Sequence, residues 1–288
     1  MWLRDNEFVT PDRSSLLTQE KVAAFQGLIY RYYKEHGRTL PWRKTTNPYH
    51  ILVSEMMLQQ TQVGRVVEKY KQFIRIFPDF ALLDMAPLYQ VLEVWHGLGY
   101  NRRAVALKKI ARIIADVFNG TFPRDLRDIM ALPGVGRATA AAICAFAFNE
   151  PVVFIETNVR SVFIQVFFRD EDNVKDSDIY PLVEKTLDRS NPREWYYALM
   201  DYGVMLKKNY SNPSRKSAHH KQQTPFTDSN RQLRGMIIKT LIENPTISES
   251  ELTCKLNRNP ESVRRNLMQL EKEGFFQRRG SEFIISSV

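Results

Sequence analysis

The chain has 288 residues, 43% of them hydrophobic, so it is long enough to form more than one domain with an apolar core. Lysine and arginine number 41 against 32 acidic residues, and the formal charge of +9 favours a polyanionic partner such as nucleic acid. Two cysteines exclude a disulfide framework, and no apolar run approaches the ~20 residues of a membrane span. We therefore expect reduced thiols, no membrane partner and a cytoplasmic protein, associated with the nucleoid in a bacterium.

Helices are expected throughout residues 18–206, because apolar residues return at three- and four-residue steps and β-like alternation is scarce. Residues 1–17 are assigned to an N-terminal extension. Proline, asparagine and glycine separate the helices at turns. The expected helices cover about 18–36, 48–59, 62–76, 87–96, 101–118, 124–131, 137–148, 157–168, 178–188 and 193–206.

A glycine-rich turn joins two of these helices. Gly134 and Gly136 can take backbone angles closed to other residues and leave backbone amides uncovered. With Arg137 beside them and the positive end of the next helix behind them, the turn suits a phosphate group. The same residues also fit a plain turn between two helices. The residues expected to bind nucleic acid here are Leu132, Gly134, Val135, Gly136, Arg137 and Thr139.

Two carboxylates lie close to apolar segments. Glu55 belongs to an otherwise apolar helical stretch, where an ionisable group is costly unless it has a partner or a function. Glu156 follows the apolar run 151–155 and comes directly before a helix. An acid at that position can also simply cap the helix, as most do.

Residues 207–229 contain many charged and turn-forming residues and few apolar ones, which predicts a basic linker between two domains. Beyond it the helical spacing returns at 231–243, 248–256 and 261–273.

A hairpin is expected to follow, between Phe275 and Ile285. Three helices and a hairpin over residues 230–288 resemble a winged helix-turn-helix, in which Arg264 and Arg265 of the third helix would face DNA. A small protein-docking domain is the alternative, because helix shape does not fix the partner.

Six short motifs occur in an order that resembles MutY-type adenine DNA glycosylases of the helix-hairpin-helix, endonuclease III-like superfamily. The resemblance extends over about residues 20–206 and implies an all-helical glycosylase fold, with two helical subdomains and a cleft. It also implies an enzyme that flips a nucleotide out of double-stranded DNA and cleaves its N-glycosidic bond. The motifs are Pro41-Trp42-Arg43, Asn47-Pro48-Tyr49, Ser54 to Val63, Trp95 to Tyr100, Leu132 to Thr139 and Asn158-Val159-Arg160.

The resemblance implies opposite roles for the two carboxylates. Glu55 would protonate the departing adenine at a ring nitrogen, and Glu156 would stabilise the oxocarbenium-like sugar and admit water. Asn158 would support Glu156. Glu156 stands where the family has an aspartate, and its extra methylene displaces the carboxylate in a site where ~1 Å errors can cost 10²-fold in rate.

The resemblance also implies contacts to the DNA stack. Gln60 would fill the gap left by the flipped base, with Gln59 and Thr61 beside it in the same DNA-binding segment. Tyr100 would contact the opposite strand. Flipping costs a few kcal/mol, less at a mispair, and this supplies part of the selectivity.

Besides Glu156, two further departures from the family and one difference from its strand-nicking relatives change the expected chemistry. Lys207 stands where the first of four iron–sulfur cluster cysteines would fall, and two cysteines cannot hold such a cluster. Ala138 stands where strand-nicking relatives carry a lysine, so we expect a monofunctional enzyme with water as nucleophile. The segment 230–288 is too short for the family's domain that reads 8-oxoguanine. The only cofactor that the resemblance leaves is a monovalent cation at the hairpin carbonyls.

We therefore predict a monomeric, monofunctional DNA glycosylase that hydrolyses a mispaired base from duplex DNA, adenine above others, with 8-oxoguanine as one candidate opposite base. A thymine or uracil mismatch glycosylase of the same superfamily is one alternative. A non-catalytic DNA-binding regulator is another.

Overall fold

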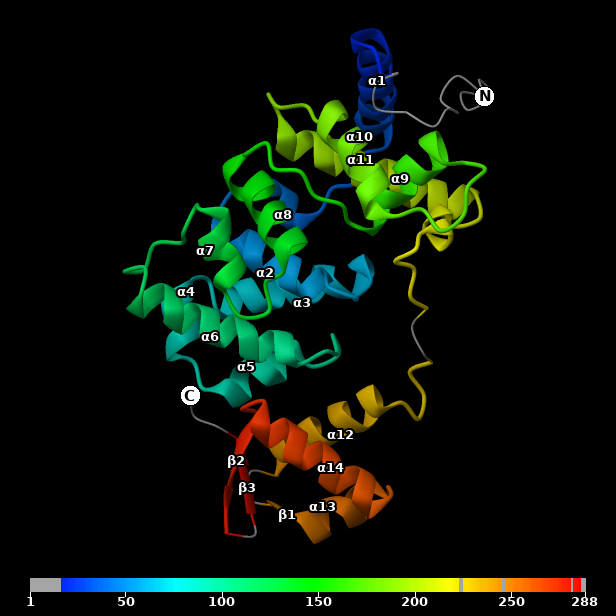
Figure 1. Ribbon diagram of the computed structural model, residues 1–288. Helices are drawn as coiled ribbons and strands as arrows, with labels where there is room; N and C mark the ends of the chain where they lie inside the picture. The colour runs from blue at the N-terminus through cyan, green and yellow to red at the C-terminus, as the bar shows by residue number, and fades with distance from the viewer. Residues whose placement is uncertain (1–16, 223–224, 245–246, 281, 286–288) are drawn as a thin grey trace. The chain divides into compact units, whose positions relative to one another are not determined.

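A computed structural model describes residues 17–222, 225–244, 247–280 and 282–285 of the chain (Figure 1). These residues are mainly helical, with one three-stranded sheet near the C-terminal end, and the helical structure expected for residues 18–206 is confirmed. No helix within the described ranges has the length and apolar character needed to cross a bilayer. The N-terminal extension predicted for 1–17 lies, apart from Leu17, outside the described residues.

The chain divides into two compact units, each made of two stretches of sequence. One takes the residues up to Thr46 together with Gly136–Gln222, and the other takes Asn47–Val135 together with the residues from Gln223 onward. The region 18–206, which the sequence suggests is one domain, therefore contributes to both units.

The first unit is a helical bundle with an aromatic core. Phe25 of α1 meets three rings of α9 and α11 edge to face, at centroid distances of 5.5 to 5.8 Å, those of Phe163, Phe167 and Trp195. These contacts fix α1 against α9 and α11. The elements of this unit are α1 (Gln19–His36), η1 (Pro41–Lys44), α8 (Arg137–Phe148), α9 (Thr157–Phe167), α10 (Asp176–Thr186), α11 (Pro192–Asn209) and η2 (Pro213–Lys216).

A buried ion pair joins the segment after α1 to α11. The Arg43 guanidinium donates to both carboxylate oxygens of Asp201, each at 2.8 Å, and Arg38 donates to the same carboxylate from its Nε at 2.6 Å. The Asp201 side chain is only 1% exposed. Burial by itself raises the pKa of Asp201, but the hydrogen bonds and charges of Arg43 and Arg38 outweigh it and hold that pKa below its ordinary value.

The second unit contains six helices before the hairpin turn. α2 begins where the Asn47 side chain accepts a hydrogen bond from the Tyr49 amide at 2.9 Å, with Pro48 as its first residue. The short helix Phe80–Met85 was not expected from the sequence, because six residues are too few to show a helical repeat. These helices are α2 (Pro48–Leu58), α3 (Val63–Ile76), α4 (Phe80–Met85), α5 (Leu88–Trp95), α6 (Arg102–Asp116) and α7 (Leu126–Ala131).

The C-terminal part contains three helices and a three-stranded antiparallel sheet with strand order β1-β3-β2 (Figure 1). The capping box between Ser248 and Glu251 is present. The side chain of each residue accepts a hydrogen bond from the backbone amide of the other. The hairpin expected after the third helix is also present. The elements are α12 (Asn230–Glu243), β1 (Ile247–Ser248), α13 (Glu249–Leu256), α14 (Pro260–Lys272), β2 (Phe276–Arg279) and β3 (Glu282–Ile285).

The segment 207–229, which the sequence predicts to be a linker, is more structured at its start than expected. α11 continues to Asn209, and the 3-10 turn η2 follows. The Val174 amide donates to the Lys216 carbonyl at 2.9 Å, and Pro213 is buried. The many charged and turn-forming residues of this segment gave no sign of this packing. A few buried side chains are enough to hold such a short turn against α9.

Candidate active site

Glu156 occupies the N-cap position of α9, so the capping role that the sequence left open is real. Its Oε1 accepts hydrogen bonds from the backbone amides of Asn158 at 2.7 Å and Val159 at 2.9 Å. Its Oε2 accepts from the Asn158 side-chain Nδ2 at 3.1 Å. Three N–H donors and the positive end of a helix thus compensate a negative charge on this half-buried carboxylate.

The pairing of Asn158 with Glu156 agrees with the supporting role that the resemblance implies for Asn158. Helix α11 approaches α9 closely at this point because residue 203 is glycine. A Cβ on Gly203 would lie 2.4 Å from the Asn158 carbonyl oxygen, so any side chain there would push the two helices apart. One helical turn later, the Lys207 Nζ donates to the Asn158 Oδ1 at 2.9 Å.

Glu55 lies in the middle of α2 in the other unit. Its neighbours Ser54, Met56 and Met57 are buried, whereas Glu55 itself is partly exposed. The Ser54 hydroxyl donates back to the Ile51 carbonyl at 2.8 Å. Glu55 is therefore a partly exposed carboxylate in a helix most of whose residues are buried, which agrees with the apolar setting expected from the sequence.

The predicted DNA-binding segment Gln59–Thr61, which we call the wedge segment, follows the end of α2. Gln60 is exposed and has a φ of +55°, and Tyr100 has a φ of +49°. Side chains other than glycine rarely adopt this left-handed conformation, and it persists only where the surroundings impose it. Gln60 and Tyr100, two of the residues that the resemblance assigns to DNA contact, thus lie in constrained turns.

Arg103 supplies much of that constraint, and sequence reasoning missed it. It is 6% exposed. Its Nη1 donates to the carbonyls of Met56, Met57 and Gln59 at 2.6 to 2.8 Å, and its Nη2 donates to the Gly99 carbonyl at 2.8 Å. Burial lowers its pKa to about 10, so it stays charged at neutral pH.

One guanidinium therefore caps α2 and ties the wedge segment to the Leu98–Tyr100 turn. The Thr61 hydroxyl donates to the Leu98 carbonyl at 3.3 Å and accepts from Arg103 at 3.0 Å. The Tyr100 hydroxyl accepts a hydrogen bond from Arg231 of α12 at 2.7 Å. Nothing in the sequence distinguishes Arg103 from the exposed Arg102 beside it, because only the fold decides which one turns inward.

The hairpin turn carries its two glycines in different roles. Gly134 has a φ of +74°, and a Cβ there would lie 3.1 Å from the Ala106 Cβ and 3.2 Å from the Met56 Cε. Gly136 is the N-cap of α8 and is exposed, with open space around it. The Gln59 Nε2 donates to the Gly134 carbonyl at 3.3 Å, which links the wedge segment to the turn.

Side-chain burial refines the DNA contacts expected at this turn. Leu132 and Val135 are buried, so these two residues can present only backbone groups to a ligand. Arg137 is exposed and Thr139 is partly exposed at the start of α8. A cavity of about 350 Å³ lies beside Gly134, and its lining includes the basic residues Arg102, Arg103 and Lys109.

Residues 53–186 match the family model of the HhH-GPD superfamily base excision DNA repair protein. The chain carries an HhH-GPD domain. This domain contains Glu55, the wedge segment, the hairpin turn and the Glu156–Asn158 pair, so every candidate catalytic residue falls within the matched residues.

The HhH-GPD domain is similar to curated adenine DNA glycosylases, which confirms the resemblance inferred from the motifs. The protein of Buchnera aphidicola subsp. Baizongia pistaciae is 38% identical over 187 residues, which are 63% of this chain and 52% of that protein. The human adenine DNA glycosylase is 32% identical over 198 residues, 65% of this chain and 36% of that protein. The chain thus spans about half the length, or less, of these relatives.

Solved structures share the HhH-GPD fold. A thermostable thymine-DNA glycosylase aligns with a TM-score of 0.59 at 27% identity, over 65% of this chain and 87% of that one. An endonuclease III trapped in a covalent DNA complex aligns with a TM-score of 0.52 at 23% identity, over 73% of this chain and 91% of that one. The second likeness supports the fold alone.

The residues of this chain do not fit a cysteine-ligated iron–sulfur cluster. Cys144 is buried inside α8 and Cys254 is exposed on α13, and the chain has no third cysteine. Lys207, which the resemblance places where relatives carry the first cluster ligand, donates a hydrogen bond to Asn158. Among the described residues no group of three or more His, Cys, Asp or Glu side chains could hold a metal ion.

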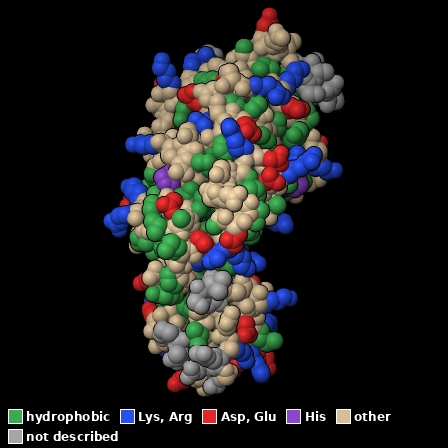
Figure 2. All heavy atoms as spheres, turned by 90° about the vertical axis from the view of Figure 1, so that its left-hand side faces the viewer, with side chains coloured by type: hydrophobic (Ala, Val, Ile, Leu, Met, Phe, Trp, Pro, Cys, Tyr) green, Lys and Arg blue, Asp and Glu red, His purple; other side chains and the backbone are tan. Residues whose placement is uncertain are grey.

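The C-terminal part presents two further predicted DNA contacts. Arg264 and Arg265 lie exposed on α14, and Arg264 is 3.8 Å from the Glu249 carboxylate. Lysine and arginine side chains are spread among acidic ones over the face in Figure 2, rather than gathered in one patch there.

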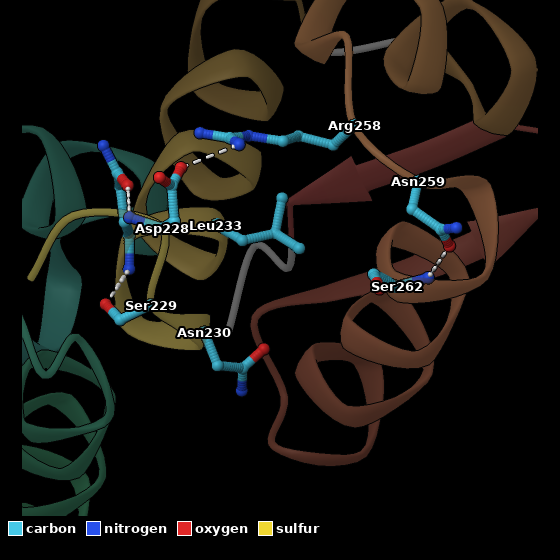
Figure 3. Close-up of a pocket in the computed structure, with 8 residues that line it drawn as sticks. Asp228, Ser229, Asn230, Leu233, Arg258, Asn259 and Ser262 are labelled. Carbon is cyan, nitrogen blue, oxygen red and sulfur yellow. Dashed lines mark hydrogen bonds and ion pairs between the residues drawn. The ribbon is translucent and has the colours of Figure 1, made fainter. Parts of the chain in front are cut away.

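A second cavity, of about 370 Å³, lies at the starts of α12 and α14 (Figure 3). Its polar groups are engaged with one another: Arg258 pairs with Asp228 at 2.9 Å, and the Asn259 side chain accepts from the Ser262 amide at 3.1 Å. Neither Glu55 nor Glu156 lines this cavity, so it is not part of the candidate site.

Proposed function

We propose that this chain is a monofunctional DNA glycosylase that removes a mispaired base, adenine above others, from duplex DNA. The observation that carries the proposal is the Glu156 carboxylate, held by three N–H donors at the start of α9, in a domain similar to adenine DNA glycosylases. A fixed, ionised carboxylate can stabilise positive charge as it develops on a sugar, without reorganising during the reaction.

The proposed reaction uses the two carboxylates in opposite ways. Glu55 donates a proton to a ring nitrogen of the adenine as the bond between the base and sugar C1′ breaks, and the bonding electrons leave with the base. Glu156 stabilises the resulting oxocarbenium-like sugar. Water then adds to C1′, and the proton that it releases restores the Glu55 carboxyl group, which leaves free adenine and an abasic site.

The proposed DNA contacts fall into two groups, one to the phosphate backbone and one to the bases. The exposed amides of the hairpin turn, with Arg137 and Thr139, would hold backbone phosphates without regard to sequence. Gln59, Gln60 and Thr61, with Tyr100, would enter the base stack. Arg264 and Arg265 of α14 would contact the duplex outside the reaction centre, and a monovalent cation would bind at the hairpin carbonyls.

The absence of strand cleavage is part of the proposal. Ala138, the second residue of α8, is exposed and carries no amine that could form a Schiff base with the opened sugar. Water is therefore the proposed nucleophile. We further propose that the protein acts as a monomer.

Thymine opposite guanine is the second candidate substrate. The observation that favours it is the likeness to a structure named as a thymine-DNA glycosylase. The same chemistry would apply, with thymine as the leaving group.

An alkaline cleavage assay tests these possibilities. The protein is incubated with duplexes that contain A opposite 8-oxoguanine, A opposite G, T opposite G or U opposite G, and strand breaks are counted with and without hot alkali. We expect breaks at adenine, and only after alkali. Breaks confined to the T or U duplexes would favour the second candidate, and breaks before alkali would contradict the monofunctional mechanism.

Glu55→Gln is the matched variant for this assay, because it keeps the shape of the side chain but cannot donate the carboxyl proton. We expect it to bind DNA normally and to show no base removal above background. Unimpaired turnover in Glu55→Gln would remove Glu55 from the mechanism. Binding to mispaired duplexes with no breaks in the unaltered protein would leave the non-catalytic alternative in place.

A further inference from the structure

Lys207 is a half-buried lysine whose side chain points at a candidate catalytic group. It lies in the last turn of α11, and its Nζ donates to the Asn158 Oδ1 at 2.9 Å. The next residue, Lys208, is exposed. Lysine side chains are rarely buried without a partner, so the hydrogen bond to Asn158 is the interaction that accounts for the half-buried position of Lys207.

The bond from Lys207 fixes which way the Asn158 amide faces. An ammonium group can only donate, so Asn158 must turn its oxygen toward Lys207. The Asn158 Nδ2 is then left facing Glu156, to whose Oε2 it donates at 3.1 Å. A side-chain amide without such a partner can rotate and present its oxygen to the carboxylate, which would be repulsive.

The backbone of α11 is built to bring this lysine into place. Gly203 and Lys207 are four residues apart and so lie on the same face of the helix. Gly203 lets α11 come close to the backbone of Asn158, where a Cβ would be 2.4 Å from the carbonyl oxygen. Lys207 then reaches the side chain of the same residue.

The charge of Glu156 offsets only part of the effect of burial on Lys207. Burial lowers the pKa of Lys207, the Glu156 carboxylate opposes this, and Arg160 adds to it. Arg160 is itself paired with Asp176 through two hydrogen bonds of 2.7 Å. Glu156 is thus the acidic group whose charge favours the ammonium form of Lys207.

We propose that Lys207 is a positioning residue, which holds the Asn158 amide so that its N–H group donates to Glu156 and keeps that carboxylate aimed for catalysis. It does this at the position where, by the resemblance, relatives place the first ligand of an iron–sulfur cluster. The inference rests on the proposed glycosylase activity.

The test compares Lys207→Met with Lys208→Met, which removes the same charge one residue away. The single-turnover rate of base removal at saturating protein is measured separately from DNA affinity. We expect Lys207→Met to be about 10- to 100-fold slower at nearly unchanged affinity, because small errors in aim are costly. Lys208→Met keeps the rate, and Lys207→Arg, which can still donate to the Asn158 oxygen, recovers most of it.

A double-mutant cycle separates positioning from a merely structural effect. If Lys207 acts through Asn158, Lys207→Met slows Asn158→Ala no further. A full, independent loss in the double variant would overturn the inference. So would an unchanged rate in Lys207→Met, or a loss confined to affinity, which would make Lys207 a phosphate contact.

A readout without catalysis keeps this inference distinct from the proposed function. The NMR resonances of the Asn158 side-chain NH₂ group should shift in Lys207→Met and stay in place in Lys208→Met. If the unaltered protein removes no base but these resonances shift, the proposed function fails while the contact stands. If they do not shift, the inference about Lys207 fails whatever the activity.

Discussion

At the scale of single residues, the contacts of Glu156 show that an N-cap position is compatible with the catalytic role proposed for its carboxylate. The donors that make it an N-cap, the amides of Asn158 and Val159, also fix the direction of its carboxylate. A capping carboxylate is held and compensated in the way that stabilising a cation requires. The sequence alone presents these as competing interpretations, whereas the geometry allows both.

Glu156→Asp tests whether the pocket is fitted to the longer acid. Aspartate is a good N-cap, so we expect the free energy of unfolding to change by less than about 1 kcal/mol. The shorter side chain withdraws the carboxylate from the Asn158 Nδ2, and we expect single-turnover base removal to fall about 10- to 100-fold. Glu156→Gln, which keeps the length and loses the charge, is the control for charge. Equal or greater activity in Glu156→Asp would show that the site accepts the family's aspartate.

At the scale of elements, the junctions between helices carry the predicted DNA contacts, and Arg103 organises one of them. The end of α2 and the Leu98–Tyr100 turn are far apart in the sequence, yet a single guanidinium bonds to the carbonyls of both. Helix ends leave carbonyls without partners, and a buried cation satisfies several at once. The positive φ values of Gln60 and Tyr100 persist because this anchor holds the turns.

Arg103→Met should destabilise the protein strongly, because it leaves buried carbonyls without a donor. We expect a loss of about 3–5 kcal/mol in the free energy of unfolding measured with urea. Arg103→Lys should recover only part of this, since one ammonium cannot replace the planar fork. Arg102→Met removes an exposed neighbour, whose side chain is 71% exposed, and should stay within about 0.5 kcal/mol of the unaltered protein. A similar small loss for Arg103→Met would contradict the anchoring role.

At the scale of the whole molecule, each compact unit is assembled from distant stretches of sequence, and buried charges help to join them. In the first unit, Asp201 of α11 is bonded by Arg38 and Arg43, which lie more than 150 positions earlier. Removing one partner of such a network leaves an uncompensated buried charge. The stability of this unit should therefore depend on pH.

The pKa of Asp201 is lower in the folded state than its ordinary value of 3.8, so the folded protein binds fewer protons than the unfolded chain there. This contribution to stability is fully present above about pH 4 and is lost as the pH falls through the folded pKa. Asp201→Asn should cost about 3–5 kcal/mol at pH 7 in urea unfolding. The gap between the unaltered protein and Asp201→Asn should narrow below about pH 4, and a constant gap would contradict the prediction.

The sequence by itself determined the helical class, the order of most helices, the hairpin turn and the resemblance to adenine DNA glycosylases that the comparisons confirm. These features are local: helix caps such as Asn47, glycines that take a positive φ such as Gly134, and apolar spacing are all set by neighbouring residues. The capping box of α13 was predictable for the same reason.

Tertiary structure alone decided which polar side chains turn inward. Arg103 and Lys207 look like their exposed neighbours Arg102 and Lys208 in the sequence, and only packing against distant segments distinguishes them. The fold of η2 on the loop before α10, through the Val174–Lys216 hydrogen bond, was hidden in the same way. The burial and hydrogen bonding of a charged group depend on partners far along the chain. The residues next to it in the sequence do not indicate which partners those are.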